Sequence, residues 1–221
     1  MKINIAHPHR WDVSPAEAIR IQQDLAGLVR HEPLAAEPGT IAGVDVSIRG
    51  DRARTAIVVV SMPDLAVVDQ TTWEGDVPFP YIPGLLSFRE MPCILPALEA
   101  LRVWPDVFMT DSQGIAHPRR FGLACHLGVV LDWPAFGVAK SRLCGVYKEP
   151  GVKKGSRAAL TDRDEPIGTV LRTRDRTHPV YVSVGHRITL AEAERLTLAC
   201  CPRYKIPEPT RLAHALSYRT V

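Results

Sequence analysis

Three segments rich in valine, isoleucine and threonine follow one another early in the chain, around residues 40–48, 55–62 and 66–74. Branched residues of this kind pack well on a pleated surface, so each segment predicts a β-strand. The short polar turn Gly50-Asp51-Arg52 is placed to join the first two as a hairpin. Three successive strands predict an antiparallel sheet at the start of the fold, and the later elements have to pack around it.

Helices and strands alternate after these three segments. Buried strands are predicted over 106–111 and 135–140, and a further strand over 179–184. The predicted helices cover 15–31, 84–101, 119–131 and 189–200, with a short terminal helix after Pro209. Pro92 and Pro96 predict a kink or a break in the second helix. This order predicts an α/β fold with a mixed sheet, three antiparallel strands followed by alternating helices and strands, flanked by helices.

Length and cysteine content limit the class of protein. The chain has 221 residues, of which 46% are hydrophobic, which is enough for one substantial core, and we expect a single domain over residues 1–221. Its five cysteines include no CxxC pair, and Cys200-Cys201 is vicinal, so reduced, buried thiols are expected rather than a zinc site. Because no apolar run approaches ~18 residues, we expect a cytoplasmic protein without a membrane partner. We also expect a monomer.

Positive charge is concentrated in one segment. The whole chain has 27 Lys and Arg against 24 Asp and Glu, a net charge of +3. The segment from Lys140 to Arg176 holds ten basic residues against five acidic ones, in a stretch that is irregular apart from one predicted hairpin. Such an excess can attract phosphate backbones. A solvated charged face explains the same composition equally well.

Three acidic residues stand where an unpaired carboxylate would be costly. Asp45 interrupts the apolar strand 41–48, and Asp111 ends the buried run 107–110. Glu90 lies in the predicted helix that follows the first sheet. Oxygen ligands of this kind suit Mg²⁺ or Mn²⁺, and a bound cation could serve phosphodiester hydrolysis. Each acid taken alone could equally cap a helix or face solvent.

A stiff turn, Pro80-Tyr81-Ile82-Pro83-Gly84, comes shortly before Glu90. Proline fixes its own φ and restricts the residue before it, so the tyrosine is presented rigidly. A nuclease needs a rigid aromatic group to separate stacked bases, although most such turns are ordinary surface turns. Lys140, at the end of a buried strand, could meet a phosphate or extend to solvent. His117 could contact phosphate or water, or be ordinary surface polarity.

These residues lie in blocks that resemble the endonuclease V family of inosine-directed repair nucleases. The matching blocks are Gly43 to Ser47, Pro80 to Glu90, Asp111 to Arg119, Gly137 to Leu143, Gly185 to Ile188 and Ile206 to His214. They follow one another in the family's order over nearly the whole chain. The resemblance implies a ribonuclease H-like fold. It also implies hydrolysis of the second phosphodiester bond on the 3′ side of deoxyinosine in DNA, leaving 3′-hydroxyl and 5′-phosphate ends.

The resemblance also implies roles by position. Asp45, Glu90 and Asp111 would bind Mg²⁺, with Mn²⁺ able to substitute, and Lys140 would contact the reacting region. His117 and His214 align near the family's active site and are further candidate catalytic residues. The wedge that fills the gap left by a displaced base would be Pro80, Tyr81, Ile82 and Pro83. The hypoxanthine pocket would be formed by Gly84, Leu86, Ser112 and Leu143.

Two positions depart from the family's pattern. The family commonly has glycine where this chain has Ser112, and glycine between glutamate and proline where this chain has Met91. The extra side chains are expected to affect substrate preference and rate more than catalysis itself. Two other functions remain open: an endoribonuclease of the same family that is specific for inosine in RNA, and a catalytically weak lesion-binding protein.

Overall fold

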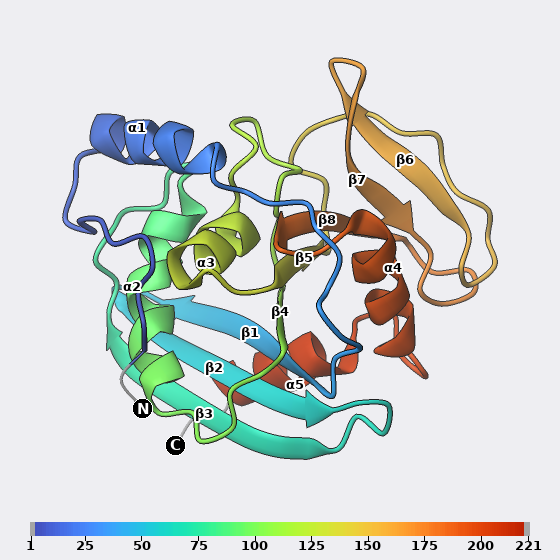
Figure 1. The fold of residues 1–221 in the computed structure, drawn as a ribbon, viewed down its shortest axis with the longest axis horizontal. Coiled ribbons are helices and arrows are strands. Elements are labelled where there is room, and N and C mark those ends of the chain that lie inside the picture. The colour runs from blue at the N-terminus through green and yellow to red at the C-terminus, as the bar shows by residue number, and fades with distance from the viewer. Residues whose placement is uncertain (1–2, 219–221) are drawn as a thin grey trace.

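A mixed sheet of eight strands forms the centre of the protein in a computed structural model that describes residues 3–218 (Figure 1). The strands are β1 (Thr40–Arg49), β2 (Arg52–Ser61), β3 (Val67–Asp76), β4 (Val107–Thr110), β5 (Ala135–Ala139), β6 (Arg157–Asp162), β7 (Glu165–Leu171) and β8 (Val180–His186). Their order across the sheet is β3-β2-β1-β4-β5-β8-β7-β6. The three early segments therefore form three neighbouring strands, as predicted.

Strand direction changes across the sheet. β1, β2 and β3 pair in antiparallel fashion, whereas β4 runs parallel to β1 and β5 runs parallel to β4. β8, β7 and β6 extend the sheet with antiparallel pairs, and β6 and β7 form the hairpin predicted within the basic segment. The mixed α/β sheet of a ribonuclease H-like fold is thus confirmed.

Alternation along β1 divides the core between two faces of the sheet. Ile41 packs in a cluster with residues of α4 (Leu190–Ala199) and α5 (Glu208–Ser217). Ala42 and Val44 point the other way, into a cluster with α2 (Leu86–Glu99) and α3 (Leu123–Leu131). Helices cover both faces, as the sequence predicted.

Several helix boundaries differ from the predictions. α1 (Pro15–Ala26) ends five residues before the predicted end at residue 31, and α3 begins at Leu123 instead of residue 119. α2 continues through Pro92 and Pro96, so a break in this helix was the wrong prediction. Packing of its apolar side against the sheet holds the helix together where proline removes backbone hydrogen bonds.

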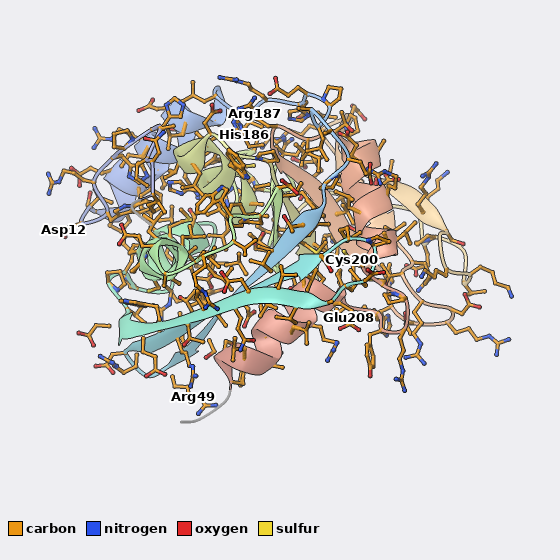
Figure 2. The ribbon with its side chains drawn as sticks, turned by 60° about the horizontal axis from the view of Figure 1, so that its bottom comes forward. Asp12, Arg49, His186, Arg187, Cys200 and Glu208 are labelled. Carbon is orange, nitrogen blue, oxygen red and sulfur yellow. The ribbon has the colours of Figure 1, made fainter. Side chains whose placement is uncertain are left out.

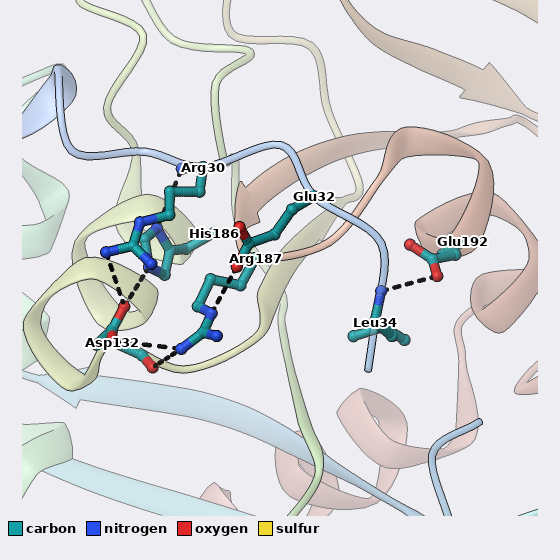
Figure 3. A network of polar contacts seen from close by, with 7 residues as sticks. All are labelled: Arg30, Glu32, Leu34, Asp132, His186, Arg187 and Glu192. Atoms are coloured by element: carbon teal, nitrogen blue, oxygen red, sulfur yellow. Dashed lines mark hydrogen bonds and ion pairs between the residues drawn. The ribbon is translucent and has the colours of Figure 1, made fainter. Parts of the chain in front are cut away.

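The segment between α1 and β1 is fastened to the end of β8 (Figure 3). The backbone N–H of Arg30 donates to Nδ1 of His186 at 3.3 Å, and Nε2 of His186 donates to Asp132 Oδ1 at 3.0 Å. Arg187 joins Asp132 to Glu32, at 3.3 and 2.8 Å. His186 lies in one of the blocks that resemble the family, Gly185 to Ile188. In this network one ring nitrogen of His186 accepts a hydrogen bond and the other donates one, as in a neutral imidazole. His186 therefore belongs to this network and not to the cluster of Asp45, Glu90 and Asp111.

The cysteines agree with the expectation of reduced thiols. All five cysteines are free thiols, four of them buried and Cys144 partly exposed. Across residues 3–218, no helix combines the length and apolar character needed to cross a membrane.

Candidate active site

Strand register brings two of the acids opposite each other. Val44 on β1 pairs with Thr110 on β4, so the next residues, Asp45 and Asp111, lie side by side at the point where β4 ends. Lys140 follows β5, the parallel neighbour of β4, and its Nζ forms an ion pair with Asp111 Oδ2. Parallel strands place their carboxyl ends at one edge of a sheet, which is why residues distant in sequence meet here.

Glu90 reaches the same place from α2. It lines a cavity of about 140 Å³ together with Asp45 and Asp111. Burial, followed by the negative charges of Asp45 and Asp111, raises the pKa of Glu90 to about 8. Burial also raises the pKa of Asp111, against the opposing influence of Lys140. The three carboxylates are close neighbours because they line this one cavity.

Residues of α5 hold Asp45 from the opposite side of the sheet. Ser217 Oγ donates to Asp45 Oδ2 at 2.6 Å, and His214 Nδ1 lies 3.3 Å from the same oxygen. Figure 2 shows α5 running from Glu208 to its other end near Arg49. Arg49 Nη2 donates to the Tyr218 carbonyl at 3.4 Å, which anchors the end of the helix that carries Ser217.

The donor chemistry fits a divalent cation. Three carboxylates around one small cavity offer the oxygen ligands that Mg²⁺ or Mn²⁺ takes, and a cation there would relieve the repulsion that raises the pKa of Glu90. As the side chains stand in residues 3–218, no three His, Cys, Asp or Glu groups already form a metal-binding set. Asp45 is turned toward Ser217 and His214, and Asp111 toward Lys140.

The proline-flanked turn is fastened at Gly84, which adopts φ of +79°. Its carbonyl oxygen accepts hydrogen bonds from Gln22 Nε2 at 3.1 Å, His117 Nε2 at 3.0 Å and Arg119 Nη2 at 2.6 Å. A side chain at this position would meet Arg119 Nη2 at 2.8 Å, so glycine suits both the backbone and the space. The turn is therefore stiff at its base, while Tyr81 at its tip is 69% exposed.

His117 is buried beneath this turn. Its Nε2 donates to Gly84, and its Nδ1 accepts from the backbone N–H of Arg119 at 3.2 Å. Burial and the charge of Arg119 lower the pKa of His117 to about 4. Both ring nitrogens are thus used within the protein, and a catalytic role for His117 stays a prediction.

A larger cavity, of about 380 Å³, joins the turn to the acids. All four residues predicted for the base pocket line it: Gly84, Leu86, Ser112 and Leu143. Three of the four predicted wedge residues, Tyr81, Ile82 and Pro83, line it as well. Asp111 and Lys140 complete one wall, and Asp111 also lines the smaller cavity. The structure therefore places the predicted base pocket directly beside the acidic cluster.

Several residues of this site were not singled out from the sequence. Gln22 lies on the buried side of α1, where a polar residue at the i+4 position from Ala18 was a usable signal. Gln113 lines the larger cavity, and its Nε2 donates to the Ser141 carbonyl at 2.8 Å. Its buried Oε1 has no hydrogen-bond partner among the residues that the structure describes. Arg119 and Ser217 act through contacts that only the folded chain reveals.

Comparisons with known proteins point to one family. A family model described as endonuclease V matches residues 23–215. An endonuclease V of Alkalilimnicola ehrlichii is 49% identical over 220 residues, which is 98% of this chain and 97% of the relative.

Solved structures agree. A crystal structure of endonuclease V from Streptomyces avermitilis has a TM-score of 0.90 and 44% identity, with 95% of this chain and 94% of that chain covered. A Ciona intestinalis endonuclease V, in complex with a 23mer DNA containing an inosine followed by a ribo-adenosine, has a TM-score of 0.82 and 28% identity, with 93% and 97% covered.

Proposed function

Because this chain belongs to the endonuclease V family, we propose that it is a DNA repair endonuclease acting at deoxyinosine. It hydrolyses the second phosphodiester bond on the 3′ side of the deaminated base and leaves 3′-hydroxyl and 5′-phosphate ends. The observation that carries this proposal is the position of Asp111, which lines both the acidic cavity and the cavity beneath the turn. If the base is held in the cavity beneath the turn, the DNA strand that carries it lies beside the acidic cavity.

Asp45, Glu90 and Asp111 would hold a divalent cation. This cation would be Mg²⁺, and Mn²⁺ could substitute for it. The chemistry supplied by such a cation is acidification of a water molecule and neutralisation of charge on the phosphate. Lys140 adds a fixed positive charge at the same edge, and its pairing with Asp111 holds it toward the cavity. Ser217 fixes one oxygen of Asp45 through a 2.6 Å hydrogen bond, which limits the rotation of that carboxylate.

The turn and the larger cavity would recognise the base. Tyr81 is exposed at the tip of a stiff loop, where it can stack in the gap that a flipped nucleotide leaves. The hypoxanthine ring carries a proton on N1 that adenine lacks, so an acceptor in the pocket discriminates between them. Gln113 Oε1 is a buried acceptor without a partner in this wall, and we assign it to that proton. An unpaired acceptor costs about 1–3 kcal/mol, which binding of the correct base would recover.

Strand-cleavage mapping tests the proposal. DNA and RNA oligonucleotides with a single inosine are incubated with the protein, with and without Mg²⁺, and the ends are located on a sequencing gel. We expect cleavage of the DNA strand at the second bond 3′ to inosine, only with the metal. The Ciona complex contains a ribose after the inosine, so the RNA arm is a direct test of the endoribonuclease alternative.

Variants of the acids make the test specific. Asp45→Asn and Asp111→Asn should abolish incision while the protein stays folded, because asparagine keeps the shape but loses the charge. Asp64→Asn, on the exposed turn between β2 and β3, is the matched control and should cleave normally. Normal incision by Asp45→Asn would refute the metal assignment. A parent protein that shifts the inosine duplex in a gel but leaves it whole would instead be a lesion-binding protein.

A further inference from the structure

A groove lined by basic residues lies outside the two active-site cavities, with a volume of about 530 Å³. It is bounded by the loop ahead of β6, by the segment between β7 and β8, and by the loop between α4 and α5. Arg172, Arg176, His178 and Lys205 line it. Glu149 is the one acidic residue among the described residues of its lining. We refer to it as the basic groove. In Figure 1 the β6–β7 hairpin beside it forms one end of the molecule.

Arg172 fixes the walls of the basic groove. The residue is 6% exposed, and its guanidinium reaches from the strand end to the facing loop. Nε donates to Gly151 O at 3.0 Å, and Nη2 donates to Pro150 O at 2.9 Å and pairs with Glu149 Oε1 at 2.7 Å. Nη1 donates to the Thr177 carbonyl. A buried arginine with this many partners indicates a built surface rather than a gap between mobile loops.

Lys205 stands on the third wall of the basic groove, in the loop between α4 and α5. Its carbonyl accepts a hydrogen bond from Thr173 Oγ1 at 2.6 Å, which fixes the backbone beside Arg172. Burial and the positive charges of Arg172 and Lys140 lower the pKa of Lys205.

The charge of the basic groove is available to a ligand. Within residues 3–218, neither Lys205 nor Arg176 forms an ion pair, although exposed cations elsewhere commonly do: Arg52 pairs with Asp76 and Arg195 with Glu37. Val152, 59% exposed, adds an apolar surface to the lining. Unpaired cations next to an apolar wall suit the phosphates and sugars of a polynucleotide. A solvated charged face would not need a buried arginine to shape it.

We propose that the basic groove binds the phosphate backbone of the substrate nucleic acid outside the active site. The inference rests on the proposed function, and it adds a contact that sets affinity without taking part in the reaction. An acidic protein partner would require the same charges, but a polynucleotide is the anionic ligand that the proposed function already brings to the protein. Polynucleotide binding is therefore the occupant that the observations favour.

Salt-dependent binding tests this proposal. The double variant Lys205→Gln/Arg176→Gln is compared with the parent and with Arg102→Gln/Arg195→Gln. This control removes two exposed cations, one in the segment before β4 and one on α4. Dissociation constants are measured for inosine-containing and undamaged duplexes between about 50 and 200 mM salt. We expect the groove variant to bind both duplexes about tenfold more weakly at the low-salt end, with a salt slope smaller by about 2. Its incision rate at saturating substrate should equal that of the parent.

Other results would overturn the proposal. Equal salt slopes in the parent and the groove variant would do so, as would a loss of the same size in the control. The charge-preserving variant Lys205→Arg/Arg176→Lys should keep the parental slope, and its failure to do so would assign the effect to fold instead of charge. The binding readout does not depend on cleavage. A parent that shows the groove-dependent slope yet leaves inosine strands whole would refute the proposed function and leave the basic groove standing.

Discussion

Replacing Tyr81 by alanine should weaken binding to inosine-containing DNA while leaving the fold intact. The side chain is 69% exposed and makes no hydrogen bond among residues 3–218, so the free energy of unfolding should change little. A tyrosine can bury about 200 Å². With 69% of the side chain still exposed, roughly 140 Å² remains to be covered by bases. At about 25 cal/mol per Å², this area sets a ceiling of about 3.5 kcal/mol.

Part of that free energy offsets the ordering of the strand, so we expect a loss of about 2 kcal/mol, close to 30-fold in affinity. Equilibrium binding to inosine-containing and undamaged duplexes, with and without the product nick, measures it. Tyr81→Phe keeps the ring and should bind like the parent. Retention of the nicked product should fall together with affinity, while the rate of the chemical step changes less. If Tyr81→Ala and the parent bind both duplexes equally, the wedge assignment is wrong.

The remaining predictions concern the scaffold and the base pocket. Gly43→Ala should destabilise the protein by about 1–3 kcal/mol in urea unfolding, because the new Cβ would lie 2.1 Å from the Pro209 backbone on α5. Gly27→Ala, with open space around it, should not. Gln113→Met should reduce the preference for inosine over adenine about tenfold in competitive cleavage, and an unchanged preference would remove Gln113 from base recognition. Since the pKa of His117 is lowered to about 4 in the fold and is about 6.5 when unfolded, the unfolded chain binds more protons. The contribution of His117 to the free energy of unfolding is therefore present above about pH 6.5 and is lost as the pH falls toward 4. The stability advantage of the parent over His117→Gln should narrow by about 2 kcal/mol between pH 7 and 5, and a constant gap would contradict this.

Local sequence was sufficient for most of the secondary structure. Runs of branched residues predicted β1, β2 and β3, and short apolar runs predicted β4 and β5, because local backbone preference and side-chain alternation are properties of neighbouring residues. Helix ends were less accurate. The apolar pattern of α1 continues past Ala26, yet the helix stops there and the chain turns toward β8. Packing against other elements overrode local propensity at that point.

The residues of the candidate site were also predicted partly from local sequence and partly from other information. The sequence alone identified Asp45, Glu90, Asp111 and Lys140, because charged residues at the ends of buried strands and in a facing helix are conspicuous against apolar neighbours. The family resemblance then gathered Gly84, Leu86, Ser112 and Leu143 into one predicted pocket, and these four do line one cavity. Their roles in recognising the base remain predictions.

Only the tertiary structure decided how these residues are held. The Gly84 carbonyl is bound by Gln22, His117 and Arg119, which lie 62, 33 and 35 positions away in the chain. Asp45 is oriented by Ser217, 172 positions away, and Arg172 joins two of the segments that bound the basic groove. Contacts of this length depend on strand register and helix packing, which no local preference encodes. Composition and motif determined which groups are available for chemistry, and long-range packing determined which of them meet.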